Sequence, residues 1–352
     1  MALATRLSLR AGDPVEWLAL RAGAVPAAAA EAWGGMALSG VLIAAVRTGL
    51  IARLAAQPYT AADLAADLGL DPLPTRLMLD CLQSAGQVAC RGGRYRLSGA
   101  ARRWLAPDSE LSVAQFVAGM DDYWSWWSGL AEAADGGLPA MHHDAPPGDP
   151  YWRRYIGGQF ELARLSAAHI ARKLRLPRDA RSLLDVGGGH GWYAAQLCRR
   201  HPGLTATVLD LPGSAAIGRE IIECAGLGHR VRFREGDAST ADLGSGYDAV
   251  LCFNLVHHLA PGQVGGLFRK IHEALAPGGV LAVMDAFAEP GHRKSAAANF
   301  LGMFVYLSSG SQVHTPARLR GWLRQAGFGA PRRIGTPRIP GQAMYVVRKT
   351  VP

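Results

Sequence analysis

The first third of the chain repeats apolar residues at helical spacing, with polar residues and glycines between the repeats. Residues 36–54 place apolar side chains on one helical face, and the alanine-rich residues 26–32 also predict a helix. Residues 60–68 and 72–85 predict two further helices, which are separated by a break at Gly69. This part of the chain is therefore predicted to be mainly helical.

A short hairpin follows these helices, because Gly92-Gly93 predicts a turn between two short strands. Helix, turn, helix and hairpin in this order predict a winged helix, so one open class of function is a DNA-binding regulator. Four arginines lie in or near the predicted unit: Arg76, Arg91, Arg94 and Arg96. The second helix, at residues 73–82, is apolar around most of its circumference and offers few side chains for reading bases. We therefore expect no nucleic-acid partner.

From about residue 180 the pattern changes to short apolar runs that alternate with helical segments. Runs of this kind predict the strands of an α/β sheet. Four of the predicted strands end at Asp185, Asp210, Glu235 and Asp285, and the fourth in chain order, from Tyr247, carries His257 and His258 at its end.

The most informative stretch is residues 183–191, Leu-Leu-Asp-Val-Gly-Gly-Gly-His-Gly, where an apolar strand runs into a glycine turn that opens a helix. Gly187, Gly189 and Gly191 fall at alternate positions, so the backbone can turn tightly and approach a ligand without Cβ interference. Residues 189–194 also satisfy the dinucleotide fingerprint G-x-G-x-x-A. The glycines alone leave a dinucleotide and another nucleoside both open.

Acidic residues at three successive strand ends help to choose between these ligands. Asp210 comes about twenty residues after the turn, where an acid accepts hydrogen bonds from ribose hydroxyls. Asp237 follows the next strand, where an adenine amino group could sit. Together with Asp185, they suit an adenosine that carries a cationic amino acid better than a pyrophosphate.

Two histidines, His257 and His258, follow the fourth strand, and Leu-Ala-Pro-Gly-Gly at residues 275–279 precedes the fifth. With these motifs, residues 150–350 resemble the catalytic domain of class I S-adenosylmethionine-dependent methyltransferases. The glycine turn, Asp-Leu-Pro from Asp210, and the histidine after strand four are similar to the small-molecule O-methyltransferase family. The resemblance implies an α/β fold with a Rossmann-like seven-stranded methyltransferase sheet and an N-terminal, mainly α, winged-helix dimerisation domain.

The resemblance also implies S-adenosyl-L-methionine as the cofactor. The glycine turn with Asp185 is expected to hold the methionine portion, Asp210 the ribose, and Asp237 with Ala238 the adenine. The complete set of predicted cofactor residues is Asp185, Gly187, Gly189, Gly191, Asp210, Leu211, Asp237, Ala238 and Phe253.

His257 is the candidate catalytic base, and it matches the family's catalytic histidine. It lies just past strand four, at the carboxyl end of the sheet, where open α/β folds bind ligands. A phenol with a pKa of about 10 is mostly neutral at pH 7, whereas a histidine with a pKa of about 6.5 is available as a neutral base. Asp285 ends strand five, where family members commonly carry the glutamate that orients the base. The predicted reaction is methylation of a hydroxyl of a small aromatic or secondary metabolite.

The residues around His257 also leave a second chemistry open. Family members commonly have an aspartate where His258 stands, and plant members have a second glutamate near the position of His314. His257, His258 and His314, with Asp285, would form a metal site for C-methylation of an enolisable 2-oxo acid. Adjacent histidines on a regular element point apart, so such a site needs an irregular turn. We predict no metal.

Aromatic and apolar residues at helical spacing are candidates for the acceptor pocket, which the corresponding regions form in the family. These candidates are Trp124, Trp127, Phe300, Met303 and Phe304. Large aromatic residues at this spacing also build ordinary cores, and the sequence leaves both interpretations open for the tryptophans. His142 and His143, in a proline-rich loop, are expected to have no role beyond local structure.

The composition, 49% hydrophobic and 18% charged over 352 residues, fits a two-domain globular enzyme. We divide the chain into a helical, winged-helix dimerisation domain at residues 1–110, aromatic-rich connecting helices at 111–150 and a catalytic domain at 151–352. The expected partners are a small-molecule acceptor and a second copy of the chain, bound through the N-terminal domain.

Charge and cysteines change this picture little. The net charge of +9 comes from arginines spread along the chain, which predicts a solvated surface. No stretch is expected to reach the roughly 18 apolar residues of a membrane span, so we predict a cytoplasmic protein with no membrane partner. The five cysteines lack C-x-x-C spacing and are predicted to be reduced and buried.

Overall fold

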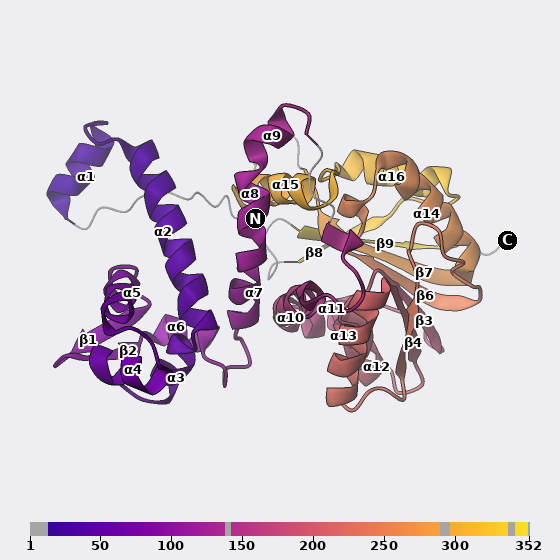
Figure 1. Cartoon of the computed structure of the whole chain (residues 1–352). Helices are drawn as coiled ribbons and strands as arrows, with labels where there is room; N and C mark the ends of the chain where they lie inside the picture. The colour runs from indigo at the N-terminus through magenta and orange to yellow at the C-terminus, as the bar shows by residue number, and fades with distance from the viewer. Residues whose placement is uncertain (1–12, 138–141, 289–295, 337–341, 351–352) are drawn as a thin grey trace. The chain divides into compact units, whose positions relative to one another are not determined.

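The structure is a computed structural model that describes residues 13–137, 142–288, 296–336 and 342–350. It separates into two compact units, one of residues 6–121 and one that runs from residue 122 to the end of the chain. The first unit is mainly helical, and the second is built on a seven-stranded sheet (Figure 1). The finer division at residues 110 and 150 stays a prediction.

The N-terminal unit contains the predicted helix, turn, helix and hairpin. Thr60 caps its helix by accepting a hydrogen bond from the amide of Asp63 at 3.1 Å, and Gly69 ends that helix in the left-handed conformation at φ 63°. The elements are α1 (Pro14–Arg21), α2 (Ala27–Arg47), α3 (Leu50–Ala56), α4 (Ala61–Leu68), α5 (Pro72–Ser84), β1 (Val88–Arg91), β2 (Arg94–Leu97), α6 (Gly99–Leu105) and α7 (Ala114–Gly119). The predicted winged-helix order is therefore present.

The single helix predicted for residues 36–54 is wrong, because the chain breaks at Gly49. This glycine has φ 80°, a left-handed conformation that ends α2 and starts α3 at a new angle. The break lets Leu50, Ile51 and Leu54 of α3 turn into the core of the unit, where each is no more than 3% exposed. Residues 26–32, predicted as a separate helix, mostly belong to the first turns of α2.

Helix α2 also corrects the expectation that no stretch is apolar enough for a membrane span. Among the described residues, one helix, Ala27–Arg47, is long and apolar enough to cross a membrane, by length and composition alone. Of the most apolar 18 residues of this helix, 11% are buried. The alanines of α2, together with its valine, leucine and isoleucine residues, give this hydropathy, and Glu31 and Arg47 are its only charges. A core helix of a soluble protein passes the same test, so the finding assigns no membrane.

The second unit begins with short helices and continues as alternating strands and helices. Its first elements are η1 (Met120–Tyr123, which starts at the boundary), α8 (Trp124–Ser128), α9 (Leu130–Ala134), η2 (His142–Asp144), α10 (Pro150–Arg164) and α11 (Ala167–Lys173). The alternating part comprises β3 (Ser182–Val186), α12 (Trp192–Arg200), β4 (Thr205–Asp210), α13 (Pro212–Cys224), β5 (Val231–Glu235), β6 (Tyr247–Phe253), η3 (Val256–His258), α14 (Pro261–Ala274), β7 (Leu275–Ala286), α15 (Ala296–Ser309), α16 (Pro316–Gln325), β8 (Arg332–Gly335) and β9 (Gln342–Arg348).

The sheet has the strand order β5-β4-β3-β6-β7-β9-β8, in which β9 runs antiparallel to its neighbours β7 and β8 and the other pairs are parallel. The chain winds outward from β3 through β4 to β5 and then returns to place β6 on the other side of β3. Ligands bind open α/β sheets at such a reversal, beyond the carboxyl ends of the strands. The order confirms the predicted seven-stranded sheet.

The central strands are apolar on both faces because helices cover both sides of the sheet (Figure 1). Leu183, Leu251 and Met284 face one buried cluster, with residues of α11 and α12. Leu184 and Val250 alternate with them and pack into a second cluster, with residues of α14 and α16. This alternation fixes the register of the strands and thereby the place of the residues that follow them.

Two smaller predictions needed correction. Strand β7 starts at Leu275, five residues before the predicted start at 280, because Leu275 already pairs with Tyr247 across a register shift. All five cysteines are free, but only Cys198 and Cys252 are buried, whereas Cys81, Cys90 and Cys224 are exposed on helices or the hairpin.

Candidate active site

The glycine turn joins β3 to α12 at the carboxyl end of the sheet. Gly187, Gly189 and Gly191 have φ values of 66°, 52° and 65°, so all three adopt the left-handed conformation that favours glycine. Gly188, which the sequence pattern did not single out, is required for another reason. A Cβ atom there would lie 2.5 Å from Cγ of Asp185. Three of the four glycines thus serve the turn itself, and Gly188 lets the chain pass close to the carboxylate of Asp185 near the end of β3.

The predicted carboxylates surround this turn. Asp185 is 1% exposed, and burial, with a smaller contribution from Asp210, raises its pKa to about 7. Asp210 accepts hydrogen bonds from the amides of Gly189 at 2.6 Å and Leu211 at 2.8 Å. Burial raises the pKa of Asp210, and these amides oppose the shift. Asp237 is exposed and accepts from the amide and hydroxyl of Ser239, both at 2.7 Å.

These residues line a cavity of about 510 Å³. Every predicted cofactor residue except Gly191 contributes to its lining, namely Asp185, Gly187, Gly189, Asp210, Leu211, Asp237, Ala238 and Phe253. Neither carboxylate oxygen of Asp185 has a hydrogen-bond partner among the described residues, although both are fully enclosed. A buried carboxylate without partners beside two further acids fits a ligand that brings cationic or hydrogen-bond-donating groups. S-adenosylmethionine, with its ammonium, sulfonium and ribose hydroxyls, is such a ligand.

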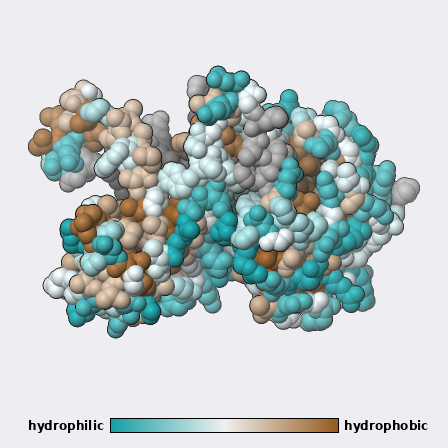
Figure 2. Space-filling view, in the orientation of Figure 1, coloured by the Kyte–Doolittle hydropathy of each residue, from teal (hydrophilic) through white to brown (hydrophobic). Residues whose placement is uncertain are grey.

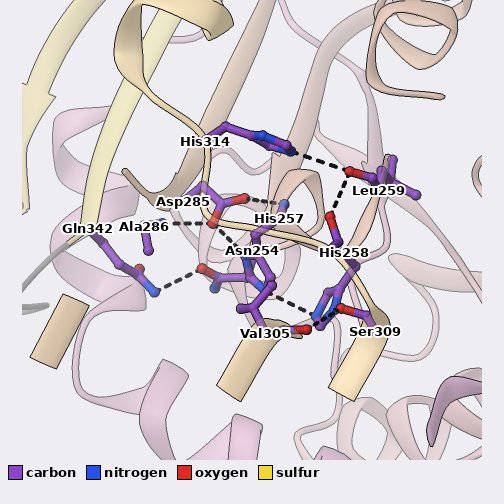
Figure 3. Close-up of polar contacts among 11 residues, drawn as sticks. Asn254, His257, His258, Leu259, Asp285, Ala286, Val305, Ser309, His314 and Gln342 are labelled. Carbon is purple, nitrogen blue, oxygen red and sulfur yellow. Dashed lines mark hydrogen bonds and ion pairs between the residues drawn. The ribbon is translucent and has the colours of Figure 1, made fainter. Parts of the chain in front are cut away.

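His257 and Asp285 contact each other directly (Figure 3), and neither is among the residues that line the cavity. Nδ1 of His257 lies 2.5 Å from Oδ1 of Asp285, and the backbone N–H of His257 donates to Oδ2 at 3.2 Å. The amide of Ala286 donates to Oδ1 at 2.7 Å. Both side chains are buried, at 8% and 1% exposure. The aspartate at the end of β7 therefore reaches the histidine, although its side chain is one methylene shorter than a glutamate.

The adjacent histidines do not point apart. They lie on η3, a 3-10 turn, and the two Nε2 atoms of His257 and His258 are 3.0 Å from each other. Nδ1 of His258 lies 3.0 Å from the hydroxyl of Ser309 at the end of α15 (Figure 3). His258 and Ser309 line the cavity, whereas His257 is not among its lining residues.

The structure does not gather these histidines into a metal site. Nε2 of His314 is directed to the carbonyl of Leu259 at 3.3 Å, away from the pair on η3 (Figure 3). Within the described ranges, no group of three or more histidine, cysteine, aspartate or glutamate side chains is arranged to hold a metal ion. We therefore do not assign His257, His258 or His314 as metal ligands.

None of the residues predicted to contact the acceptor is among the described residues that line this cavity. Trp127 and Phe304 are partly buried and pack against a cluster that includes Trp126, 5% exposed. The others are more exposed, with Trp124 at 38%, Phe300 at 53% and Met303 at 40% exposure. Their contact with an acceptor stays a prediction.

Other residues reach the cavity without having been predicted. His143, for which no role was expected, lines the cavity, and its ring centroid lies 4.7 Å from that of His258 in an edge-to-face arrangement. Trp152 and Tyr155 of α10 also line it. The side chain of His142 lies outside the described residues. The only sequence signal was the density of aromatic residues around 143–155, which does not say which side chains face inward.

Trp152 is held by contacts that no sequence pattern indicates. Its Nε1 donates to the carbonyls of Ala145 and Pro146 at 3.2 and 3.0 Å. Gly213, at the start of α13, leaves the space for its indole, because a Cβ atom at Gly213 would lie 2.2 Å from Nε1. This close approach keeps α10 against α13 on one side of the cavity.

A mostly parallel sheet with a glycine turn and carboxylates at its strand ends is typical of a nucleoside-binding enzyme, and comparison with known proteins names its family. The O-methyltransferase domain matches residues 147–329, and the O-methyltransferase dimerisation domain matches residues 30–107. The chain belongs to the O-methyltransferase family. It is an S-adenosylmethionine-dependent methyltransferase and carries the family's dimerisation domain.

Curated relatives support the same family. The 3-hydroxy-5-methyl-1-naphthoate 3-O-methyltransferase of Streptomyces sahachiroi is 28% identical over 83% of this chain and 86% of that protein. The tetracenomycin polyketide synthesis 8-O-methyl transferase TcmO of Streptomyces glaucescens is 30% identical over 82% of this chain and 87% of its own. Two relatives carry other names: the N,N-dimethyltransferase OxyT of Streptomyces rimosus and the L-tyrosine C(3)-methyltransferase of Streptomyces lavendulae. They are 32% and 26% identical over 71% and 76% of this chain, and over 75% and 77% of their own.

The fold is shared with solved structures. Human N-acetylserotonin methyltransferase, in complex with S-adenosylmethionine, superposes with a TM-score of 0.80 at 21% identity, over 97% of this chain and 100% of that chain. A putative O-methyltransferase from Nostoc punctiforme gives a TM-score of 0.83 at 21% identity, over 92% of this chain and 99% of its own. At this identity, the likeness establishes the fold.

Proposed function

We propose that the enzyme methylates a hydroxyl of a small aromatic secondary metabolite, with His257 as the general base. The observation that carries this proposal is the 2.5 Å contact between Nδ1 of His257 and Asp285 at the carboxyl end of the sheet. A carboxylate on Nδ1 fixes the tautomer of the ring and stabilises the imidazolium that forms when Nε2 takes a proton. The two relatives described above as O-methyltransferases support the same reaction type.

The residues of the glycine turn hold the cofactor in this proposal. Asp210 binds the ribose hydroxyls, Asp237 and Ala238 face the adenine, and Asp185 with Gly187 and Gly189 lies along the methionine portion. Leu211 and Phe253, which line the same cavity, contribute apolar contacts. Bound S-adenosylmethionine supplies an electrophilic methyl group on a sulfonium. The protein then has to align the acceptor oxygen with that methyl group, so positioning accounts for much of the rate.

The acceptor lies next to the histidines in this proposal. His143, Trp152 and Tyr155 present aromatic surface to the cavity, which favours a planar aromatic acceptor. Tyr155 also stacks on Tyr151, with ring centroids 5.4 Å apart. An acceptor that extends beyond this cavity would add contacts with residues predicted from the sequence, namely Trp124, Trp127, Phe300, Met303 and Phe304.

We propose a homodimer formed through the N-terminal unit. The dimerisation domain covers residues 30–107, and the exposed apolar side chains of the unit lie mainly on α1, α2 and α5. Among them are Val15, Trp17, Leu18, Trp33, Met36, Leu73 and Leu77, with exposures of 49% to 77%. Figure 2 shows apolar surface over α1 and α5. An exposed apolar patch of this kind fits a second copy of the same chain.

Free cysteines at the surface favour a reducing compartment, so we propose a cytoplasmic location. The residues of the catalytic cavity are those of a small-molecule site, with aromatic rings, glycines and acids. They leave no role for duplex DNA in the proposed reaction.

The proposal is tested by binding and then by turnover. Calorimetry should give saturable binding of S-adenosylmethionine and S-adenosylhomocysteine, one per chain, with NADH and duplex DNA as controls. A panel of hydroxynaphthoates and simpler phenols is then screened for formation of S-adenosylhomocysteine, with and without added iron. The methylated atom is assigned in the product by NMR. A product methylated at carbon or nitrogen, or turnover that depends on iron, would replace the O-methylation proposal.

A further inference from the structure

The hydrogen bonds around His258 fix where its proton lies. The hydroxyl of Ser309 donates to the carbonyl of Val305 at 2.8 Å, because a carbonyl oxygen can only accept. The oxygen of Ser309 is then the acceptor for Nδ1 of His258 at 3.0 Å, so that nitrogen carries the hydrogen. Burial, with the neighbouring rings of His257 and His143, lowers the pKa of His258 well below its usual value. The ring is therefore neutral, and its Nε2 has no hydrogen.

The proton on His257 follows from this arrangement. Since Nε2 of His258 can only accept, Nε2 of His257, 3.0 Å away, has to be the donor. On the far side of the ring, Nδ1 of His257 meets Asp285, whose carboxylate already accepts from the amides of His257 and Ala286. His257 therefore carries a hydrogen on the nitrogen that a general base needs free.

His258 also stands between His257 and the cavity. The two rings are 4.1 Å apart between centroids, and His258 and Ser309 line the cavity, whereas His257 is not among its lining residues. Among the described residues, the titratable groups in contact with this pair are Asp285 on β7, which meets His257, and His143 on η2, which meets His258, whereas His314 is directed to the carbonyl of Leu259.

We propose that His258 is a positioning residue that holds a proton on Nε2 of His257 and screens this nitrogen from the cavity. The inference rests on the proposed function of His257, and it adds a step before the reaction. The ring of His258 has to turn away from Ser309 and His257 before an acceptor hydroxyl can approach Nε2 of His257. His257, whose Nδ1 keeps the hydrogen that it donates to Asp285, has to release its Nε2 proton to water at the same stage and become the neutral ring, because only the bare nitrogen can take the proton of the acceptor.

The first test measures the protonation of His257 without any acceptor. Mass spectrometry measures the rate of deuterium exchange at the imidazole C2–H as a function of pH. Fragmentation of the peptide between the two histidines gives a separate curve for each ring, and the midpoint of each curve reports the protonation of that ring. His258→Phe keeps a buried ring but removes both nitrogens, so the Nε2 hydrogen of His257 loses its acceptor. We expect the midpoint of His257 to fall by roughly one pH unit, the size that corresponds to loss of one charge-assisted hydrogen bond.

A milder pair of variants guards against a folding defect in His258→Phe. Ser309→Ala removes the acceptor that keeps the hydrogen of His258 on Nδ1, so His258 can adopt either tautomer. This variant should lower the midpoint of His257 by less than His258→Phe does. Ser308→Ala is the matched control, since this buried serine on the same helix donates to the same carbonyl of Val305, at 3.3 Å, whereas the hydrogen bond with His258 is made by Ser309. An unchanged or raised midpoint in His258→Phe, or equal shifts in the two serine variants, would overturn the proposal.

The second test measures access to His257. His258→Ala should speed the acylation of His257 by diethyl pyrocarbonate several-fold over wild type, with the modified ring identified by mass spectrometry. Equal rates would show that His258 does not screen His257. Both tests read His257 directly, so they are independent of whether His257→Ala abolishes turnover, which tests the proposed function instead.

Discussion

Asp285 binds His257 at two points, through the ring Nδ1 at 2.5 Å and through the backbone N–H at 3.2 Å. One contact orients the imidazole, and the other ties the turn η3 to the end of β7. A single aspartate thus sets both the direction of the ring and the position of the backbone that carries it.

We expect His257→Ala and Asp285→Asn to lower kcat by roughly 10²–10⁴-fold on an accepted hydroxyl substrate, the usual contribution of a positioned base. The affinity for S-adenosylmethionine should stay near wild type, because neither side chain lines the cofactor cavity. Turnover assays measure kcat, and calorimetry on the same preparations measures the affinity for S-adenosylmethionine, so the two effects are separated. Full turnover by His257→Ala would remove this residue from the mechanism.

Asp210→Ala should weaken S-adenosylmethionine binding by roughly 10- to 100-fold, which corresponds to about 1.5–3 kcal/mol for hydrogen bonds to a charged group. The carboxylate is held in place by the amides of Gly189 and Leu211. Asp242→Ala is the control, since this exposed acid lies outside the cavity lining. Calorimetry measures both variants, and equal affinity for Asp210→Ala and wild type would contradict the ribose assignment.

Binding of S-adenosylmethionine should tighten as the pH rises through 7. Burial raises the pKa of Asp185 to about 7, so the carboxyl is largely protonated below that pH and ionised above it. A cationic ligand favours the ionised form, and binding below pH 7 should release a proton. Calorimetry in two buffers of different ionisation enthalpy counts that proton.

Asp185→Asn is the matched variant for this pH dependence. It should bind the cofactor more weakly at pH 8 and show no proton release near pH 6.5. A wild-type affinity that is flat between pH 6 and 8 would mean that Asp185 does not meet the charged part of the ligand.

Gly188→Ala should destabilise the protein by about 1–3 kcal/mol, the usual range for overpacking, and weaken cofactor binding. The added methyl group would meet Cγ of Asp185 at 2.5 Å and a side-chain carbon of Val208 at 2.8 Å. Gly266→Ala on helix α14 is the control, because its Cβ meets only the end of the Arg269 side chain, at 4.0 Å. Urea unfolding of both variants gives the comparison, and equal stabilities would show that the turn relaxes.

Trp33→Glu combined with Leu18→Glu should convert a dimer into monomers, because both side chains are exposed, at 71% and 62%, on the proposed interface. Light scattering after size exclusion gives the mass of the wild type and the variant. Arg332→Glu on strand β8 of the catalytic unit is the control and should keep the wild-type mass. A monomeric wild type, or a variant that stays dimeric, would contradict this interface.

The residues around the glycine turn were predictable because their placement depends on local order. An acid at the end of each parallel strand lies at the same edge of the sheet, whatever the details of packing, and three φ values above zero call for glycine at Gly187, Gly189 and Gly191. Gly188 was missed because its requirement is a steric contact with Asp185, which no pattern of spacing reveals.

The sequence by itself determined the sheet, the winged-helix order, the glycine turn and the pairing of a histidine with the last acid of β7. Only the tertiary structure decided which side chains face the cavity. His143 reaches His258 from η2, and Ser309 reaches it from α15, 51 residues along the chain. Such contacts depend on how separate helices pack on the sheet and on a 3-10 turn that brings neighbouring rings together. Periodicity predicts a buried face, but it does not predict which distant residue shares that face.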